Sequence, residues 1–157
     1  MTMSGDPMKG LFRGFDIATS GLRAELQRSE VVAANLGNMH RTGNAHKEPY
    51  RRRQVVFAEV LDDATSKALG VGSGDGVRAG GVQVAKVVED RKTDFPVFYQ
   101  PGHPDADETG KVLGSNVDLF QELVDMNVIE RSFDANLQAL RAYRGMLQNT
   151  ISNMSTK

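Results

Sequence analysis

Two long segments, one near each end of the chain, repeat apolar residues at steps of three and four. The first covers residues 8–36 and the second covers residues 117–154. Steps of this size place the apolar residues on one face of an α-helix. The sequence therefore predicts a long helix at each end, and no proline interrupts the second one.

The apolar face of each predicted helix forms a seam that needs a partner. We expect the two seams to pack against each other and against neighbouring subunits, because two helices alone cannot shield so long an apolar surface. The second helix also has small apolar residues on its opposite face, at Val128, Ala135 and Ala142, and so expects neighbours on both sides. The predicted seam and subunit-interface residues are Phe12, Phe15, Leu22, Leu26, Leu36, Leu119, Leu123, Met126, Phe133, Leu137, Leu140, Leu147 and Ile151.

The segment between the helices, residues 43–116, has no helical period. Short β-prone runs occur at 54–60, 82–88 and 95–99, and turn-forming stretches separate them. The clearest of these stretches is the glycine-rich run 70–81. We predict an α+β fold in which long N- and C-terminal helices pack as a coiled-coil-like pair, with a small β-rich or extended middle segment.

The predicted boundaries divide the chain into four segments. They are a disordered N-terminal extension over 1–7, a first helix with its following motif over 8–42, the middle segment over 43–116, and a second helix over 117–157.

Polar residues mark the expected helix ends. Asn35 and Asn38 lie where the first helical pattern stops, and we expect their side chains to bond backbone groups freed there. This break would redirect the chain from the helical layer into the β-rich segment. Asn116 is the expected N-cap of the second helix, with Asp118 favourable in its first turn.

Composition excludes several classes of function. Lys and Arg number 19 against 20 Asp and Glu, so nothing favours binding to nucleic acid or to an anionic membrane surface. The chain has no Cys, which excludes disulfides, thiolate nucleophiles and zinc–cysteine sites. No apolar run approaches the roughly 20 residues of a membrane-spanning helix. The N-terminus also lacks the pattern of a conventional secretory signal, so we expect neither membrane insertion nor signal cleavage.

Candidate metal sites in the sequence are incomplete. The stretch 105–110 resembles the front half of a calcium loop, with oxygen ligands at Asp105, Asp107 and Thr109 before Gly110. Asn116 stands where a calcium loop needs a bidentate Glu, so a solvated turn is the preferred interpretation. The histidines form no helical pair of metal ligands, and we expect them in water-exposed loops. They are His40, His46 and His103.

Candidate catalytic and phosphate-binding motifs are also incomplete. The glycine-rich run 70–81 lacks the Gly-Lys-Ser/Thr ending of a phosphate-binding loop. The basic run 50–54 can contact phosphates, but a solvated or protein-binding strand edge is the preferred interpretation. No Gly-x-Ser-x-Gly nucleophile motif occurs. We therefore expect neither an enzyme nor a bound cofactor or metal.

The first helix and the residues after it resemble the N-terminal signature of bacterial flagellar rod, hook and related axial proteins. That signature is an Ala-Asn-Asn-Leu-Ala-Asn-like string followed by Asn-Thr-x-Gly-like residues, and here it lies within 14–43, "GFDIATSGLRAELQRSEVVAANLGNMHRTG". Ala33 and Gly37 stand where the family more often has other residues. The matching positions are Ala34, Asn35, Leu36, Asn38, Thr42 and Gly43.

Three further stretches resemble a proximal rod subunit within that family. They are "PYRRRQVVF" at 49–57, "GHPDADETGKV" at 102–112, and the helical segment 116–151. The pair at 114–115, Gly-Ser, departs from the Met-Pro-like pair that would be expected there. With these stretches the resemblance covers nearly the whole chain.

The resemblance implies a structural function. Such proteins leave the cytoplasm through the flagellar type III export apparatus without a cleaved signal, and they assemble in the periplasm as the rod of the basal body. Their terminal helices pack in the inner layer of a helical tube that transmits torque to the hook. The implied partners are copies of the chain itself and other proximal rod, rod-base and distal rod subunits.

Two alternatives come from the residues alone. The same amphipathic ends suit a secreted helical adaptor or effector that binds a partner helix. A calcium- or phosphate-binding enzyme module is the third interpretation.

Overall fold

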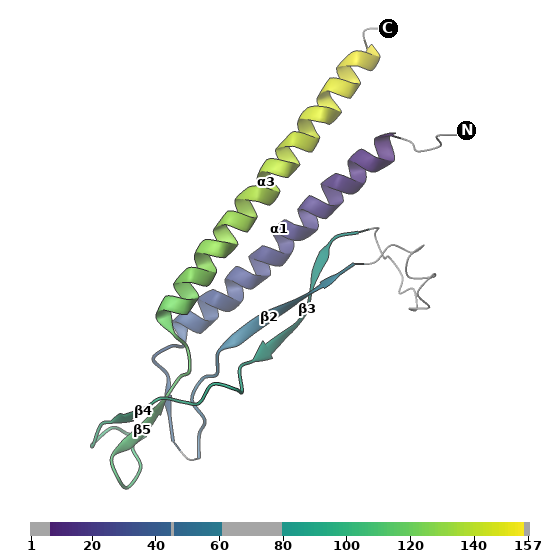
Figure 1. The fold of residues 1–157 in the computed structure, drawn as a ribbon. Coiled ribbons are helices and arrows are strands. Elements are labelled where there is room, and N and C mark those ends of the chain that lie inside the picture. Colours follow the sequence, from purple (N-terminus) through teal and green to yellow (C-terminus); the bar gives the residue numbers. More distant parts are fainter. Residues whose placement is uncertain (1–6, 45, 61–79, 156–157) are drawn as a thin grey trace, which may run out of the picture. The chain divides into compact units, whose positions relative to one another are not determined.

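One long helix precedes the strands in the sequence and another follows them (Figure 1). This order confirms the predicted α+β fold. The computed structural model describes residues 7–44, 46–60 and 80–155, and for residues 7–13 and 154–155 it describes the backbone alone. Residues 1–6 of the predicted disordered extension and most of the glycine-rich run therefore lie outside the described residues. The elements are α1 (Pro7–Gly37), β1 (Thr42–Gly43), β2 (Arg53–Glu59), β3 (Val82–Glu89), β4 (Val97–Tyr99), β5 (Lys111–Gly114) and α3 (Leu119–Ser155).

The chain forms two compact units. The first unit comprises Met1–Leu26, Phe57–Ala85 and Glu130–Lys157. The second unit comprises Gln27–Val56 and Lys86–Ile129. Both helices and the β2–β3 pair contribute residues to each unit, so neither unit coincides with a continuous stretch of sequence.

In the first unit, α1 and α3 approach each other at glycines of α1. A Cβ atom placed on Gly14 would lie 2.4 Å from Cζ of Tyr143, and one on Gly21 would lie 2.8 Å from Nδ2 of Asn136. These pairs match earlier residues of α1 with later residues of α3, so the helices run antiparallel. Small side chains on α1 therefore permit close packing in this unit.

The start of β3 is tied to α1 by one serine of the first unit. The Ser20 hydroxyl accepts a hydrogen bond from the Val82 N–H at 3.1 Å and donates one to the Ile17 carbonyl at 2.7 Å. Gly81 has a φ of 136°, which L-residues rarely adopt, and its carbonyl accepts the Val60 N–H at 2.9 Å. Glycine at this position thus lets β2 and β3 meet beside the helix.

The second unit contains a three-stranded antiparallel sheet in the order β1–β5–β4. Gly43 pairs with Leu113, and Phe98 pairs with Val112, whose side chain is buried. A Cβ atom on Gly43 would lie 2.2 Å from the Lys47 carbonyl oxygen, so only glycine fits there. The runs expected at 54–60, 82–88 and 95–99 correspond to β2, β3 and β4, whereas β1 and β5 had no sequence signal.

The helix ends differ in part from the expectation. Asp118, rather than Asn116, caps α3: its carboxylate accepts the N–H groups of Phe120 at 2.7 Å and Gln121 at 3.2 Å. Asn38 bonds the helix end as expected, because its side-chain amide donates to the Ala34 carbonyl at 2.7 Å.

Within the single chain the predicted seam residues differ in exposure. Leu26, Leu123 and Ile151 are 55%, 51% and 61% exposed, and Leu119 is exposed as well. The buried positions of the helices combine small residues with polar ones and with the larger apolar residues Val32 and Ile129. The buried helix residues are Ala18, Gly21, Ala24, Val32, Asn35, Glu122 and Ile129. The half-buried seam residues are Phe15, Leu22, Leu36, Met126, Phe133, Leu137, Leu140 and Leu147. For Phe12 the structure describes only the backbone.

Candidate functional site

A buried polar cluster joins α1, α3 and the chain entering β2 in the second unit. The Arg52 and Glu122 side chains are 5% and 0% exposed, and the Arg52 Nε donates to Glu122 Oε1. The same guanidinium donates through Nη2 to Asp125 Oδ2 at 2.7 Å. Arg28 reaches the other oxygen of Asp125 at 3.2 Å. Two arginines and two carboxylates thus balance each other's charge.

Asn35 completes this polar cluster and uses every hydrogen-bonding position of its amide. Its Nδ2 donates to the Arg53 carbonyl at 2.8 Å and to Glu122 Oε2 at 3.1 Å. Its Oδ1 accepts the Arg53 N–H at 2.9 Å and the Tyr50 hydroxyl at 3.0 Å. The expectation that Asn35 bonds freed backbone at the end of α1 is therefore wrong. Its side chain instead fixes the segment leading into β2.

Asn116 ties a second set of backbone groups to the polar cluster. Its side chain accepts the Arg52 N–H at 2.7 Å and donates to the carbonyls of Asp90 at 3.0 Å and Thr93 at 3.3 Å. The Asp90 N–H in turn donates to the Arg52 carbonyl at 2.8 Å. This cross-linking of three chain segments explains why Asn116 is buried and does not cap α3.

The carboxylate of Asp90 closes the turn after β3. Its oxygens accept the Thr93 hydroxyl at 2.7 Å and the backbone N–H groups of Lys92 at 2.9 Å and Thr93 at 3.2 Å. These donors favour the ionised form, so the pKa of Asp90 lies below its ordinary value of 3.8. The Tyr50 hydroxyl, by contrast, has a raised pKa, chiefly because burial disfavours its charged form.

The polar cluster fixes the positions of α1, α3 and the segment leading into β2 relative to one another within the second unit. A buried ion pair adds little net stability over a well-packed apolar core, but it tolerates few alternative arrangements, because any misplaced partner leaves a buried charge unpaired. We therefore interpret this site as the element that sets how α1, α3 and β2 meet within the second unit.

Two of the motifs behind the family resemblance meet beside β5. The Thr42 hydroxyl donates to Asp105 Oδ2 at 2.6 Å, and Thr42 pairs with Gly114 across the sheet. Asp107 accepts the N–H groups of Thr109 at 2.8 Å and Lys111 at 2.9 Å. The stretch compared with a calcium loop is thus a turn closed by its own backbone. Within 7–44, 46–60 and 80–155, no group of three His, Asp or Glu side chains is arranged to hold a metal ion.

An exposed apolar face lies on the first turns of α3. Its most exposed members are Phe120 at 78%, Val124 at 63% and Leu123 at 51%, and it continues at Leu119 and Val128. At 100° per residue, Phe120 and Val124 lie opposite to the buried residues Glu122 and Ile129, and the other three residues of the face flank them. Of its members, Leu119 and Leu123 belong to the predicted seam, and Val128 belongs to the opposite side that the sequence predicted to be apolar. We call these five residues the α3 apolar face.

The helices of the described chain carry too many polar residues to cross a membrane.

Sequence reasoning missed the buried Arg52–Glu122 pair and the half-buried pairs that Asp125 forms with Arg28 and Arg52. Glu122 and Asp125 flank an apolar seam as ordinary polar positions would, and Arg52 belongs to a basic run expected at the surface. The available signal was their spacing, because Glu122, Asp125 and Ile129 share one helical face and two of these three are acidic. An acidic pair on an inward face requires basic partners, but only the fold reveals that Arg28 and Arg52 supply them.

A family model and several curated relatives both identify the chain as similar to flagellar basal-body rod proteins. A family model described as "Flagellar basal body rod FlgEFG protein C-terminal" matches residues 108–154. The chain is 36% identical over 144 residues to the flagellar basal-body rod protein FlgC of Bacillus subtilis, covering 89% of this chain and 95% of the relative. The protein of the same name from Escherichia coli O157:H7 is 37% identical, with 88% and 93% covered. That from Borreliella burgdorferi is 31% identical, with 91% and 97% covered.

Proposed function

Because the chain belongs to the FlgC family of flagellar basal-body rod proteins, we propose that it polymerises through its terminal helices into the helical tube of the proximal rod. It is a structural subunit of the flagellar basal body and not an enzyme. The tube would transmit torque from the basal body to the hook through many contacts that share the load. No observation favours the alternative of a secreted adaptor.

The α3 apolar face is the observation that carries this mode of assembly. Large apolar side chains in a row on one side of a helix are rarely left in water by a soluble protein and mark a surface that another chain covers. Leu26 on α1 and Ile151 on α3 are further exposed apolar residues of the terminal helices. Neighbouring subunits would bury these residues, whereas the polar cluster would hold each subunit's own helices in place.

The finer partners and location follow from the family resemblance. We propose copies of the chain, other proximal rod subunits, rod-base subunits and distal rod subunits as neighbours in the periplasmic rod. Delivery would use the flagellar type III export apparatus without cleavage of a signal. The terminal helices would be loosely ordered during export and would gain their remaining order on docking, since passage through a narrow channel requires an unfolded or loosely folded chain.

Leu123→Asp tests assembly through the helices. Because Leu123 is about half exposed, the change is expected to lower the free energy of unfolding of the monomer by only about 1 kcal/mol. Burying a new carboxylate between subunits costs far more, so the variant should be exported but missing from isolated basal bodies. Immunoblots of basal bodies and swimming assays in a strain lacking the chromosomal copy measure both effects.

Gln138→Asp is the matched control, because it adds the same charge at an exposed polar position of α3. It should incorporate and support swimming. If Leu123→Asp incorporates and swims as well as this control, assembly through the α3 apolar face is refuted.

A further inference from the structure

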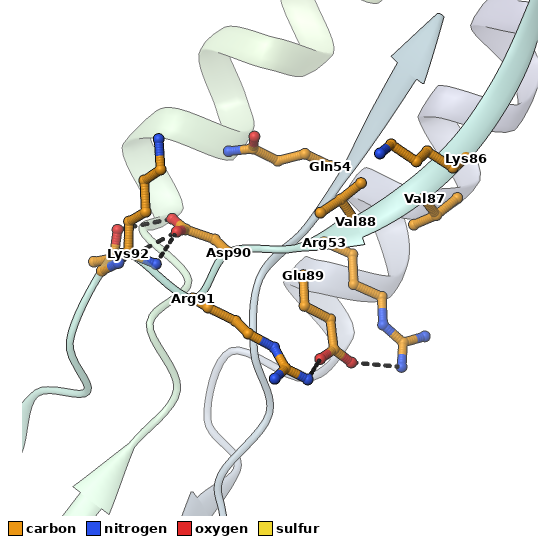
Figure 2. Close-up of a pocket in the computed structure, with 10 residues that line it drawn as sticks. Arg53, Gln54, Lys86, Val87, Val88, Glu89, Asp90, Arg91 and Lys92 are labelled. Atoms are coloured by element: carbon orange, nitrogen blue, oxygen red, sulfur yellow. Dashed lines mark hydrogen bonds and ion pairs between the residues drawn. The ribbon is translucent and has the colours of Figure 1, made fainter.

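A basic groove of about 990 Å³ lies along β2, β3 and the turn after β3, within the second unit (Figure 2). Val87 and Val88 give it apolar surface, and both are exposed. Four basic and two acidic side chains line it, which leaves a surplus of positive charge. These charged residues are Arg53, Lys86, Arg91, Lys92, Glu89 and Asp90.

The acidic residues of the groove are already engaged within it. Glu89 lies 3.8 Å from the Arg53 guanidinium and 3.4 Å from that of Arg91, and Figure 2 shows both arginines directed toward it. The Asp90 carboxylate bonds the turn that follows β3. Lys86 and Lys92 are exposed, so the groove presents positive charge next to apolar surface.

A hairpin in the same unit has the complementary character. We call residues 94–114, which contain β4 and β5, the acidic arm. Its acidic residues outnumber the single basic residue, Lys111, and they are Asp94, Asp105, Asp107 and Glu108. Val97 and Tyr99 lie on one side of β4, as alternate residues of a strand do, and they are 58% and 73% exposed.

The acidic arm also has an open strand edge. β4 is the last strand of its sheet, and among the described residues β5 is its one strand partner. Such an edge, with apolar side chains on it, is prone to contact another chain. Charge, apolar surface and an open edge thus coincide on the arm.

We propose that the acidic arm of one copy docks in the basic groove of a second copy. The inference rests on the proposed rod function and adds a contact formed outside the helices. Opposite charges would steer the two surfaces together, and Val97 and Tyr99 would cover Val87 and Val88. Because the contact joins two different surfaces, it does not close on itself and repeats from copy to copy along a filament.

The absence of cysteine from the chain makes the contact directly testable. Val88→Cys and Tyr99→Cys copies are produced together in a strain lacking the chromosomal copy, and isolated basal bodies are treated with a short bis-maleimide. A dimer of the chain should form when both variants are present, and not with either variant alone. A chain that carries both cysteines should give a ladder of multimers, because each copy then offers both surfaces. Lys86→Cys with Glu108→Cys provides a second pair at exposed polar positions, should the first pair fail to incorporate.

Reversing the charges tests whether attraction between the acidic arm and the basic groove drives docking. Lys86→Glu with Lys92→Glu on the groove copy should lower the dimer yield about tenfold, because like charges then face each other. Adding Asp94→Lys with Glu108→Lys to the arm copy should restore the yield to within about twofold of the original.

Two outcomes overturn the inference while leaving the rod function intact. One is that basal bodies containing both cysteine variants give no dimer. The other is that the groove cysteine links to a different protein, which would show that another acidic segment occupies the groove. A chain absent from basal bodies altogether would instead refute the proposed function, and this inference with it.

Discussion

The α1–α3 contact differs in kind between the two units. In the second unit it is made by buried charges and an amide, with Glu122 held by both Arg52 and Asn35. In the first unit it is made by glycines against larger side chains, as at Gly14 and Tyr143. Directional polar contacts specify one arrangement, whereas contacts of small residues permit closeness without specifying it. We infer that the second unit is set by the chain itself and that the first depends more on neighbouring subunits.

Among the predicted changes, Glu122→Ala should lower the free energy of unfolding most. It leaves the Arg52 guanidinium and the Asn35 amide buried without their partner, so the free energy of unfolding should fall by about 3–5 kcal/mol. Urea unfolding followed by circular dichroism measures the change. Glu130→Ala removes an exposed carboxylate from the same helix and should stay within about 0.5 kcal/mol of the wild type. Equal losses in the two variants would show that the polar cluster does not set the second unit.

Gly14→Ala should have a smaller effect in the first unit. Alanine favours a helix over glycine by up to about 1 kcal/mol, but the new methyl group would meet the Tyr143 ring. Overpacking costs about 1–3 kcal/mol, so a net loss of about 1 kcal/mol is expected in the same urea experiment.

Gly145→Ala is the control for that loss, because among the described residues no atom beyond its own turn of α3 lies within 4 Å of the point where its new methyl group would stand. It should stabilise the chain by up to about 1 kcal/mol. If Gly14→Ala stabilises equally, the close approach of α1 and α3 in the first unit is not maintained in solution.

Asp107→Asn should have the smallest effect, visible only in acid. The Lys111 N–H and the Thr109 hydroxyl donate to the ionised carboxylate, so the pKa of Asp107 lies below its ordinary value of 3.8. Its contribution to stability is complete above that value and is lost as the pH falls through the lowered pKa. The wild-type chain should therefore lose more stability than Asp107→Asn on acidification below about pH 4. Identical pH profiles in thermal melts would contradict this assignment.

The elements of the fold were largely readable from the sequence. Spacings of three and four predicted both helices, and β-prone runs predicted β2, β3 and β4. The short strands β1 and β5 were missed, because four residues or fewer carry too little pattern and their pairing depends on partners distant in sequence. The predicted segment boundaries remain predictions.

The candidate site was far less readable. The Asn35 motif was recognised, but its role was misassigned because its partners, Arg53 and Glu122, are far away in the sequence. The predicted seam is not settled by the single chain, because eight of its members are half-buried there and four are exposed. Whether neighbouring subunits cover exposed members such as Leu123 and Ile151 remains a prediction.

No other amino acid can make the four hydrogen bonds of the Asn35 amide at this position. Aspartate offers no donor for Glu122 and would set a second negative charge beside it. Leucine has a similar size but would leave four polar groups without the hydrogen bonds that the Asn35 side chain now makes with them. Glutamine carries the right atoms one methylene too far out. Even a substitution of similar size at residue 35 would therefore remove hydrogen bonds that position the segment between α1 and β2.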